Sequence, residues 1–329
     1  MGVARPAGFE PATVGLEVRC SVQLSYGRSA PGGTPGHSVR GRVLRLHIYI
    51  GLSVRVGVVG VLSLGAVAVD FEVPLSGGDV SEGVVRVGET VRRPLRAHSP
   101  AVHGVLRHLE AVGFDGAPRV LGIDERGREV LSWVPGEVPR RPLEGHVVSD
   151  EVLKGVGRLL RRYHDAVESY EAPEGAPWDG VTSNLDGEPE VIGHCDVTPE
   201  NVVFRGGVPV ALIDFDLARP TTRLFDVVTA LRHWGPIADP ADRDALLYRV
   251  DVGRRLRVFC DAYGLDEVRR REVLPAARVR FERSYRAMRL RAEGGGSWGR
   301  MWRGGAGQRI RRAQDWLERH WDELDARLC

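Results

Sequence analysis

The chain has almost no lysine: Lys154 is the only one among 46 basic residues, and all the others are arginine. It has four cysteines and no C-x-x-C pair, which excludes a disulfide framework and favours a reducing compartment such as the cytoplasm. Its uncharged apolar run, residues 56–69, has fourteen residues, short of the roughly 20 that a spanning helix needs. The net charge of +2 argues neither for nor against nucleic-acid binding. We therefore expect a cytoplasmic protein with no membrane or nucleic-acid partner and an unknown oligomeric state.

Residues 1–69 differ in composition from the rest of the chain. They carry seven arginines against two glutamates, and residues 27–42 are rich in glycine, proline and serine. Such a composition cannot bury enough apolar surface to fold and predicts disorder. The peptide around Gly8-Phe9-Glu10-Pro11 also resembles a translated complement of a transfer-RNA gene. We expect an atypical extension over 1–69 that is disordered or reflects an over-called start codon.

A predicted β-hairpin organises the rest of the chain. Two apolar runs, 201–204 and 208–213, flank Gly206-Gly207. A Gly-Gly pair between such runs predicts a tight hairpin, because both residues can take positive φ. In that register Asn201 lies opposite Leu212, and Asp214 is its diagonal neighbour on the same face. The two side chains can then converge on one point.

The polar residues of this stretch suit a metal-dependent reaction. A carboxylate and an amide oxygen aimed at one point are ligands that Mg²⁺ prefers, so Asn201 and Asp214 are the predicted metal ligands. Asp196 lies five residues before Asn201, in the loop that enters the hairpin. That spacing leaves it free to face a substrate at the edge of the metal site.

The pattern His194-x-Asp196-x₄-Asn201, followed by Ile213-Asp214, resembles the aminoglycoside phosphotransferase family, a kinase-like branch that includes choline-kinase-like enzymes. The resemblance implies a bilobal α+β protein-kinase-like fold and phosphoryl transfer from Mg-ATP, with GTP not excluded. It implies Asp196 as the base for the acceptor hydroxyl and His194 as a brace of the catalytic loop. Cys195 replaces the usual Gly or Asn, and a nucleophilic cysteine is a disfavoured alternative because it leaves the metal pair unexplained.

Residues 70–135 are expected to form a small β-rich nucleotide-binding lobe. Strands are predicted over 71–75, 84–87, 90–93, 119–123 and 129–134. The glycine-rich turn Ser76-Gly77-Gly78 would let bare N–H groups approach phosphates. The resemblance aligns Arg92 with the phosphate-anchoring lysine of the family and places the adenine hinge at Trp133 and Val134.

One departure from the family weakens the anchor. Kinase-like folds carry a glutamate on the helix that comes next, here predicted over 101–112, to orient the anchoring cation. The aligned positions are Val102 and His103, and Glu110 lies two turns later. The sequence therefore leaves open what orients the arginine, and whether Arg92 or Arg93 faces the cleft, since strand neighbours point to opposite faces.

Residues 136–329 are expected to form a large helical lobe that binds the acceptor. Helices are predicted over 149–168, 226–233, 240–262, 266–291 and 307–328, and a flexible glycine-rich loop is predicted over 294–305. The leading hypothesis is a small-molecule kinase with a hydroxyl acceptor. A catalytically weak nucleotide-binding regulator or scaffold is the alternative, favoured by the missing lysine and helix glutamate. A protein kinase is disfavoured, because no D-F-G or A-P-E motif follows Asp214.

Overall fold

The computed structural model divides the chain into two units, Met1–Asp70 and Phe71–Cys329. The residues that it describes are 19–22, 48–51, 71–75, 83–179 and 188–329. In the first unit, strand β1 (Arg19–Val22) pairs antiparallel with β2 (Ile48–Gly51). The other expectations for residues 1–69 lie outside the described residues. Among the helices described, none is long and apolar enough to cross a bilayer.

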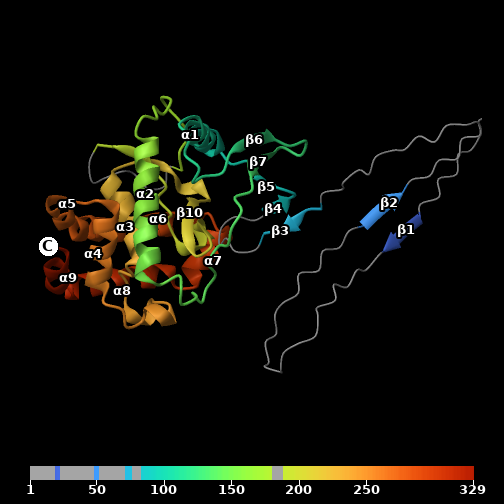
Figure 1. Ribbon diagram of the computed structural model, residues 1–329. Helices are drawn as coiled ribbons and strands as arrows, with labels where there is room; N and C mark the ends of the chain where they lie inside the picture. The colour runs from blue at the N-terminus through green and yellow to red at the C-terminus, as the bar shows by residue number, and fades with distance from the viewer. Residues whose placement is uncertain (1–18, 23–47, 52–70, 76–82, 180–187) are drawn as a thin grey trace, which may run out of the picture. The chain divides into compact units, whose positions relative to one another are not determined.

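The second unit begins with a five-stranded antiparallel sheet in the order β3-β4-β5-β7-β6 (Figure 1). Its strands are β3 (Val73–Pro74), β4 (Val85–Val87), β5 (Thr90–Pro94), β6 (Val120–Ile123) and β7 (Arg128–Ser132). The predicted hairpin around Gly88 is confirmed, and Gly88 has the positive φ of 57° that its turn requires. Strand β5 is central and pairs with β4 on one side and with β7 on the other.

Helices make up most of the second unit outside this sheet. The described helices are α1 (Ser99–Ala111), α2 (Asp150–Val167), α3 (Arg223–Trp234), α4 (Val252–Tyr263), α5 (Glu267–Arg271), α6 (Val273–Glu293), α7 (Gly296–Arg303), α8 (Ala306–Arg319) and α9 (Trp321–Leu328). Short strands β8 (Val191–Gly193) and β11 (Arg219–Thr221) pair with each other, as do β9 (Val202–Arg205) and β10 (Val208–Leu212). This is the α+β composition that the sequence predicted.

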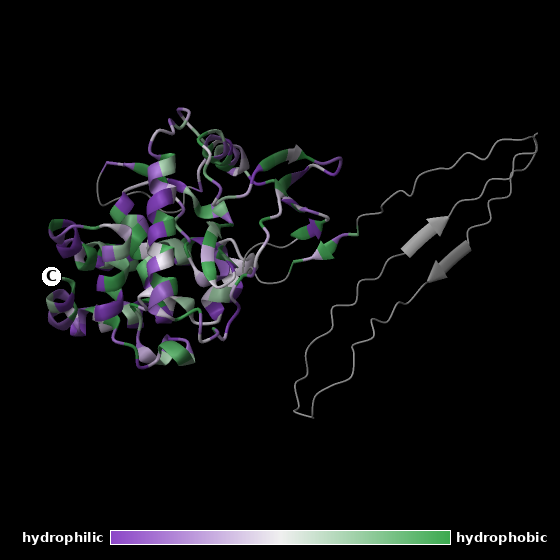
Figure 2. Ribbon diagram, viewed as in Figure 1, coloured by the Kyte–Doolittle hydropathy of each residue, from purple (hydrophilic) through white to green (hydrophobic). Residues whose placement is uncertain are grey.

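Helix α2 lies at the centre of the helical part (Figure 1). Ser149 caps it by accepting a hydrogen bond from the Val152 amide. Hydrophilic and hydrophobic residues alternate along it in Figure 2, as a helix with one buried stripe requires. Its stripe includes Leu153, Leu160 and Tyr163, which are fully buried. The Tyr163 hydroxyl donates to the Ile192 carbonyl at 2.7 Å and so ties α2 to β8.

Four predictions of where helices begin and end were wrong. The predicted helix 240–262 begins only at α4, because Asp251 caps that helix by accepting from the Arg254 amide. The predicted helix 266–291 is divided into α5 and α6 at Glu272, and 307–328 is divided at His320, where the backbone leaves the helical region. The predicted loop 294–305 contains α7. In the three predicted helices the hydrophobic period continued across a local break, whereas the predicted loop was inferred from its glycines.

The central hairpin forms as predicted at its turn. Gly206 and Gly207 have φ of 58° and 78°, and Arg205 pairs with Val208. Further along, the register shifts between Pro209 and Ala211. Leu212 therefore pairs with Val202 and not with Asn201, so that part of the prediction was wrong. A β-bulge adds one unpaired residue to a strand, which a register counted from the turn cannot anticipate.

Candidate active site

The catalytic loop is held from behind by Asp226, a fully buried residue of α3. Its carboxylate accepts from the backbone amides of His194 (2.7 Å) and Cys195 (2.8 Å). His164 of α2 lies 3.0 Å from the same carboxylate. Burial disfavours the charged form, but the hydrogen bond from His164 and the nearby histidines hold the pKa of Asp226 below its usual value. Asp226 therefore fixes the loop backbone as an anion.

Cys195 has a φ of 60°, in the left-handed region. Glycine and asparagine enter this region at least cost, which explains physically why they suit this position. Burial raises the pKa of the Cys195 thiol to about 12. The thiol is therefore protonated at neutral pH and is not an activated nucleophile.

His194 braces the loop by its side chain as well as its backbone. The ring is fully buried, and its Nε2 lies 3.0 Å from the Ile213 carbonyl. Burial lowers the pKa of His194 despite the nearby Asp226 carboxylate. A neutral ring that donates to Ile213 links the catalytic loop to the end of the hairpin, where Asp214 follows.

Asp196 and Asn201 form a direct pair. Asn201 Nδ2 donates to the Asp196 carboxylate at 2.9 Å and to its backbone carbonyl at 3.0 Å. Burial, together with the negative charge of Asp214, raises the pKa of Asp196 to about 7, although the positive charge of Arg280 opposes the rise. A carboxylate that titrates near neutrality suits a general base.

The predicted metal ligands come together by a different register. The Ile213 amide donates to the Asn201 carbonyl at 2.9 Å, so Asn201 lies opposite Ile213, beside Asp214. Asp214 itself has a φ of 63°, which turns its side chain out of the strand. Its pKa is raised by burial and by the neighbouring charge of Asp216, against the pull of Arg93.

Arg93, and not Arg92, reaches this carboxylate. Arg93 Nη1 lies 3.0 Å from Asp214 and Nη2 lies 2.8 Å from Asp216. Arg92 points to the other face of β5, where it lies 3.6 Å from Asp124 and is 30% exposed. Strand alternation shows only that the two arginines face opposite sides of the sheet. The structure places Arg93 on the side of Asp214, so the prediction that Arg92 faces this side was wrong.

The acidic partner of Arg93 is Glu129, a residue that the sequence prediction missed. Glu129 lies directly opposite Arg93 on the neighbouring strand β7, and Arg93 Nε lies 2.7 Å from its carboxylate. The other oxygen of Glu129 lies 2.5 Å from His103 Nε2 on α1. The carboxylate thus comes from a strand, and the helix supplies a histidine that holds it. Glu129 shares the inward strand face with buried Leu131, and this inward position was the available signal.

Carboxylate groups outnumber the arginines at this point of the site. Glu129, Asp214 and Asp216 surround the guanidinium of Arg93, and Arg96 lies 3.5 Å from Asp216, so three carboxylates face two arginines and one negative charge remains in excess. Asn201 uses its amide N–H₂ on Asp196, which leaves its carbonyl oxygen as an acceptor. Excess carboxylate with an amide oxygen fits a hard divalent cation such as Mg²⁺. In the described residues, no cluster of three His, Cys, Asp or Glu side chains has metal-binding geometry, so any such site would use the Asn201 oxygen or water.

The predicted hinge follows strand β7. The Trp133 amide donates to the Glu89 carbonyl at 2.8 Å, and the Arg86 guanidinium stacks 4.2 Å above the Trp133 ring. Val134 lies next to it and is half-buried. Three residues later, Glu137 and Phe204 exchange both backbone hydrogen bonds, which fastens the connecting segment to β9. The predicted phosphate turn Ser76-Gly77-Gly78 lies outside the described residues.

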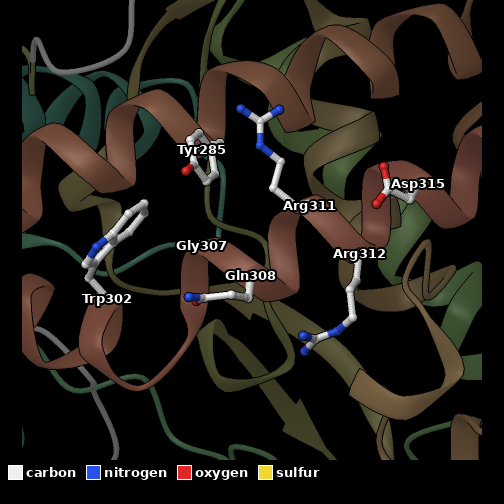
Figure 3. Close-up of a pocket in the computed structure, with 7 residues that line it drawn as sticks. All are labelled: Tyr285, Trp302, Gly307, Gln308, Arg311, Arg312 and Asp315. Carbon is white, nitrogen blue, oxygen red and sulfur yellow. The ribbon is translucent and has the colours of Figure 1, made fainter.

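A cavity of about 320 Å³ lies away from these residues, among α6, α7 and α8 (Figure 3). It is lined by Tyr285, Trp302, Gly307, Gln308, Arg311, Arg312 and Asp315. None of the predicted catalytic or metal-binding residues contributes to it. Arg311 and Arg312 are paired with Glu282 (2.8 Å) and Asp242 (2.6 Å), so their positive charges are already matched by carboxylates.

Comparison with known proteins gives a family match and several similar chains. Residues 171–259 match the phosphotransferase enzyme family. The chain is 38% identical over 208 residues to the trifolitoxin immunity protein of Rhizobium leguminosarum bv. trifolii, over 60% of this chain and 76% of that protein. It is 26% identical over 217 residues to homoserine kinase of Phenylobacterium zucineum (strain HLK1), over 50% of this chain and 66% of that protein.

Solved structures agree on the fold. A microcompartment-associated aminopropanol kinase superposes with a TM-score of 0.52 at 14% identity, covering 79% of this chain and 95% of that one. The GDP complex of aminoglycoside 2'-phosphotransferase-IIIa gives 0.50 at 14% identity, covering 79% and 94%. These likenesses confirm the predicted bilobal kinase-like fold, while the lobe boundaries stay a prediction. With the match over 171–259 and the 38% identity to the immunity protein, they show that the chain belongs to the phosphotransferase enzyme family.

Proposed function

We propose that the chain transfers the γ-phosphate of Mg-ATP to a hydroxyl group of a small molecule. The observation that carries the proposal is the Asp196–Asn201 pair beside Asp214, in which the pKa of Asp196 is raised to about 7. A base of that pKa can take the proton of an alcohol as its oxygen attacks phosphorus. Phosphoryl transfer otherwise needs positioning and charge neutralisation, and the remaining residues supply both.

Each site residue has one role in this proposal. Asp196 accepts the hydroxyl proton, and His194 keeps the loop in place through its bond to the Ile213 carbonyl. Asn201 and Asp214 supply oxygen ligands to Mg²⁺, which when bound neutralises phosphate charge. Arg93 replaces Arg92 as the phosphate anchor, held in line by Glu129. The backbone at Trp133 and Val134 binds the adenine ring of the nucleotide, and residues 76–78 cover its phosphates.

Arginine at the anchor position has a chemical consequence. Its planar guanidinium binds oxyanions in a fork, whereas lysine is a compact point charge. In the structure the fork joins Asp214 and Asp216, so phosphate oxygens would compete with carboxylates for its N–H groups. ATP is the nucleotide we propose. GTP stays possible, since one relative of this fold was solved with GDP.

Turnover measurements test the proposal directly. Full-length protein with Mg-ATP is assayed for ADP release across a panel of amino-sugar, amino-alcohol, hydroxy-acid and nucleoside acceptors. We expect at least one acceptor to stimulate ADP release, and Asp196→Asn to abolish the stimulation while Mg-ATP still binds in calorimetry. Unchanged turnover in Asp196→Asn would remove Asp196 from the mechanism, and a complete lack of Mg-ATP binding would refute the kinase proposal.

A second candidate function is protection of the cell from a toxic compound. It is favoured by the 38% identity to a protein named for immunity to trifolitoxin. Protection could come from phosphorylating the toxic compound. It could also come from binding without catalysis, which is one form of the regulator or scaffold alternative. Expression of wild type and of Asp196→Asn in a trifolitoxin-sensitive strain separates the two: catalysis requires that only wild type protects, whereas a binding role predicts equal protection.

A further inference from the structure

Two basic residues of α3, Arg232 and His233, lie on the face of that helix that meets Arg280 of α6. Thr229, Arg232 and His233 stand at helical positions i, i+3 and i+4, so they share one face of α3. Arg280 of α6 donates its Nε to the Thr229 hydroxyl at 3.0 Å. Its guanidinium therefore lies one turn from Arg232 and His233.

This basic group borders the catalytic loop. The Trp234 indole of α3 donates to the Val197 carbonyl at 2.9 Å, which fixes the end of α3 against the residue after Asp196. Burial lowers the pKa of Arg280 to about 10, while the charge of Asp196 acts in the opposite direction. The positive charge of Arg280 in turn opposes the rise in the pKa of Asp196. Arg280 therefore lies within electrostatic reach of the proposed base.

Arg219 adds a more deeply buried cation to the group. It is only 8% exposed, and its positive charge is among the causes that lower the pKa of Arg280. Its Nη1 donates to the Leu217 carbonyl at 3.3 Å, while its buried Nε has no hydrogen-bond partner in the part of the chain that the structure describes. A buried donor without an acceptor is costly and indicates a missing polar partner.

The hydrogen bonds of Arg232 and Arg280 within the described residues go to uncharged acceptors, the Ile237 carbonyl and the Thr229 hydroxyl. Burial and the charge of Arg280 lower the pKa of Arg232 to about 9, and burial holds the pKa of His233 well below its usual value. An exposed arginine of the same helix differs, since Arg278 of α6 pairs with Glu318. Within the described ranges, these two half-buried arginines therefore form no ion pair of the kind that Arg278 forms.

Gathering partly buried cations costs free energy, because burial and mutual repulsion both disfavour the charged forms. An anion bound among them would remove that cost. We propose that Arg219, Arg232 and Arg280 bind an oxyanionic group, a carboxylate or a phosphate, of the acceptor, and thereby hold its hydroxyl at Asp196. The inference rests on the proposed kinase function and names its substrate class: hydroxy acids or phosphorylated alcohols, and not polyamines.

Matched acceptors test the charge preference. Full-length protein and Mg-ATP are assayed with 4-hydroxybutyrate, 4-hydroxybutyramide and 4-amino-1-butanol, and with glycerol 3-phosphate against glycerol. We expect kcat/KM at least about tenfold higher for the anionic member of one set, the gain of one charge-assisted hydrogen bond. The set that responds distinguishes a carboxylate from a phosphate. Preference for the neutral or cationic members would overturn the inference.

Substitutions locate the preference. Arg232→Gln and Arg280→Gln should each raise KM for the anionic acceptor, and raise the ratio of that KM to the KM for the neutral acceptor, at least about tenfold. Arg280→Lys should restore part of the loss, and Arg278→Gln, on the same helix but paired with Glu318, should behave as wild type. An unchanged KM for the anionic acceptor in both glutamine variants would refute the assignment. Thermal melting of each variant checks that it folds.

A binding measurement separates this inference from the kinase proposal. Calorimetry with inorganic phosphate and with 4-hydroxybutyrate, in the absence of nucleotide, should show binding to wild type and to Arg278→Gln but not to the Arg232→Gln, Arg280→Gln double variant. If no acceptor is phosphorylated but this difference holds, the anion site stands and the kinase proposal fails. If nucleotide is turned over but wild type binds neither anion, the anion site is wrong.

Discussion

Replacing Glu129 by glutamine tests the buried support of Arg93, the proposed phosphate anchor. Glu129 is 1% exposed and contacts both Arg93 (2.7 Å) and His103 (2.5 Å). Glutamine has nearly the same volume but no charge, so the change removes the ion pair with Arg93 and weakens the hydrogen bond with His103 without opening a cavity. Breaking a buried pair costs about 3–5 kcal/mol when the partner is left alone. Arg93 keeps Asp214 and Asp216 as partners, so we expect a smaller loss of about 1.5–3 kcal/mol, the contribution of one hydrogen bond to a charged group.

The assay is urea or thermal unfolding of the full chain. At about 2–4 °C per kcal/mol for a domain of this size, Glu129→Gln should lower the melting temperature by about 5–10 °C. The matched control is Glu89→Gln in the turn between β4 and β5, whose pair with Arg86 is 2.8 Å long, close to the 2.7 Å of the Glu129 pair, but whose side chain is 75% exposed. Exposed pairs contribute little, so the control should change stability by less than about 0.5 kcal/mol. Equal effects of the two variants would refute the reasoning.

The remaining predictions concern the anchor, the base and the loop. Arg93→Gln should weaken Mg-ATP binding at least about tenfold, whereas Arg92→Gln should change it less than about twofold; calorimetry would contradict this if the order were reversed. Turnover should rise with pH through about 7, because Asp196 acts only as the carboxylate, and Asp196→Asn should lose that rise together with activity. Because the folded-state pKa of Asp196 is raised, its ionisation destabilises the fold as pH rises to 7, so Asp196→Asn should gain more melting temperature at pH 8 than at pH 5. Gly193→Ala should cost about 2 kcal/mol or more, because its Cβ would lie 2.4 Å from the Thr221 methyl, whereas Gly145→Ala, which meets nothing within 4 Å, should be nearly neutral in the same unfolding assay.

Sequence reasoning was strongest where chemistry is local. The Gly206-Gly207 turn formed as predicted because its conformation depends on those two residues alone. The spacing from His194 to Asn201 was sufficient to indicate the family, since the loop that carries them is short and continuous. The predicted register was wrong at the bulge between Pro209 and Ala211, because Asn201 lies opposite Ile213 and not opposite Leu212. The proximity of Asn201 to Asp214 survived because the shift was a single residue.

The predictions of helix boundaries were wrong for a related reason. The apolar period of the C-terminal region continues through Glu272 and His320, where the backbone breaks. Periodicity reports which side of a helix is buried, not whether the helix is continuous. The breaks depend on how successive helices pack, which a window of sequence does not contain.

By itself, the sequence indicated the class of chemistry, that of a phosphotransferase: an aspartate, an amide and a second carboxylate at fixed spacing beside a hairpin, in the pattern of the family. Tertiary structure alone decided that Arg93 faces the site, because two neighbours on a strand are equivalent until the strand is placed in its sheet. It also decided that Glu129 and His103 support that arginine, and that Asp226 holds the loop from 31 and 32 residues away in the chain. These pairings join segments far apart in sequence, and only the packing of the sheet against the helices brings their charges within hydrogen-bond distance.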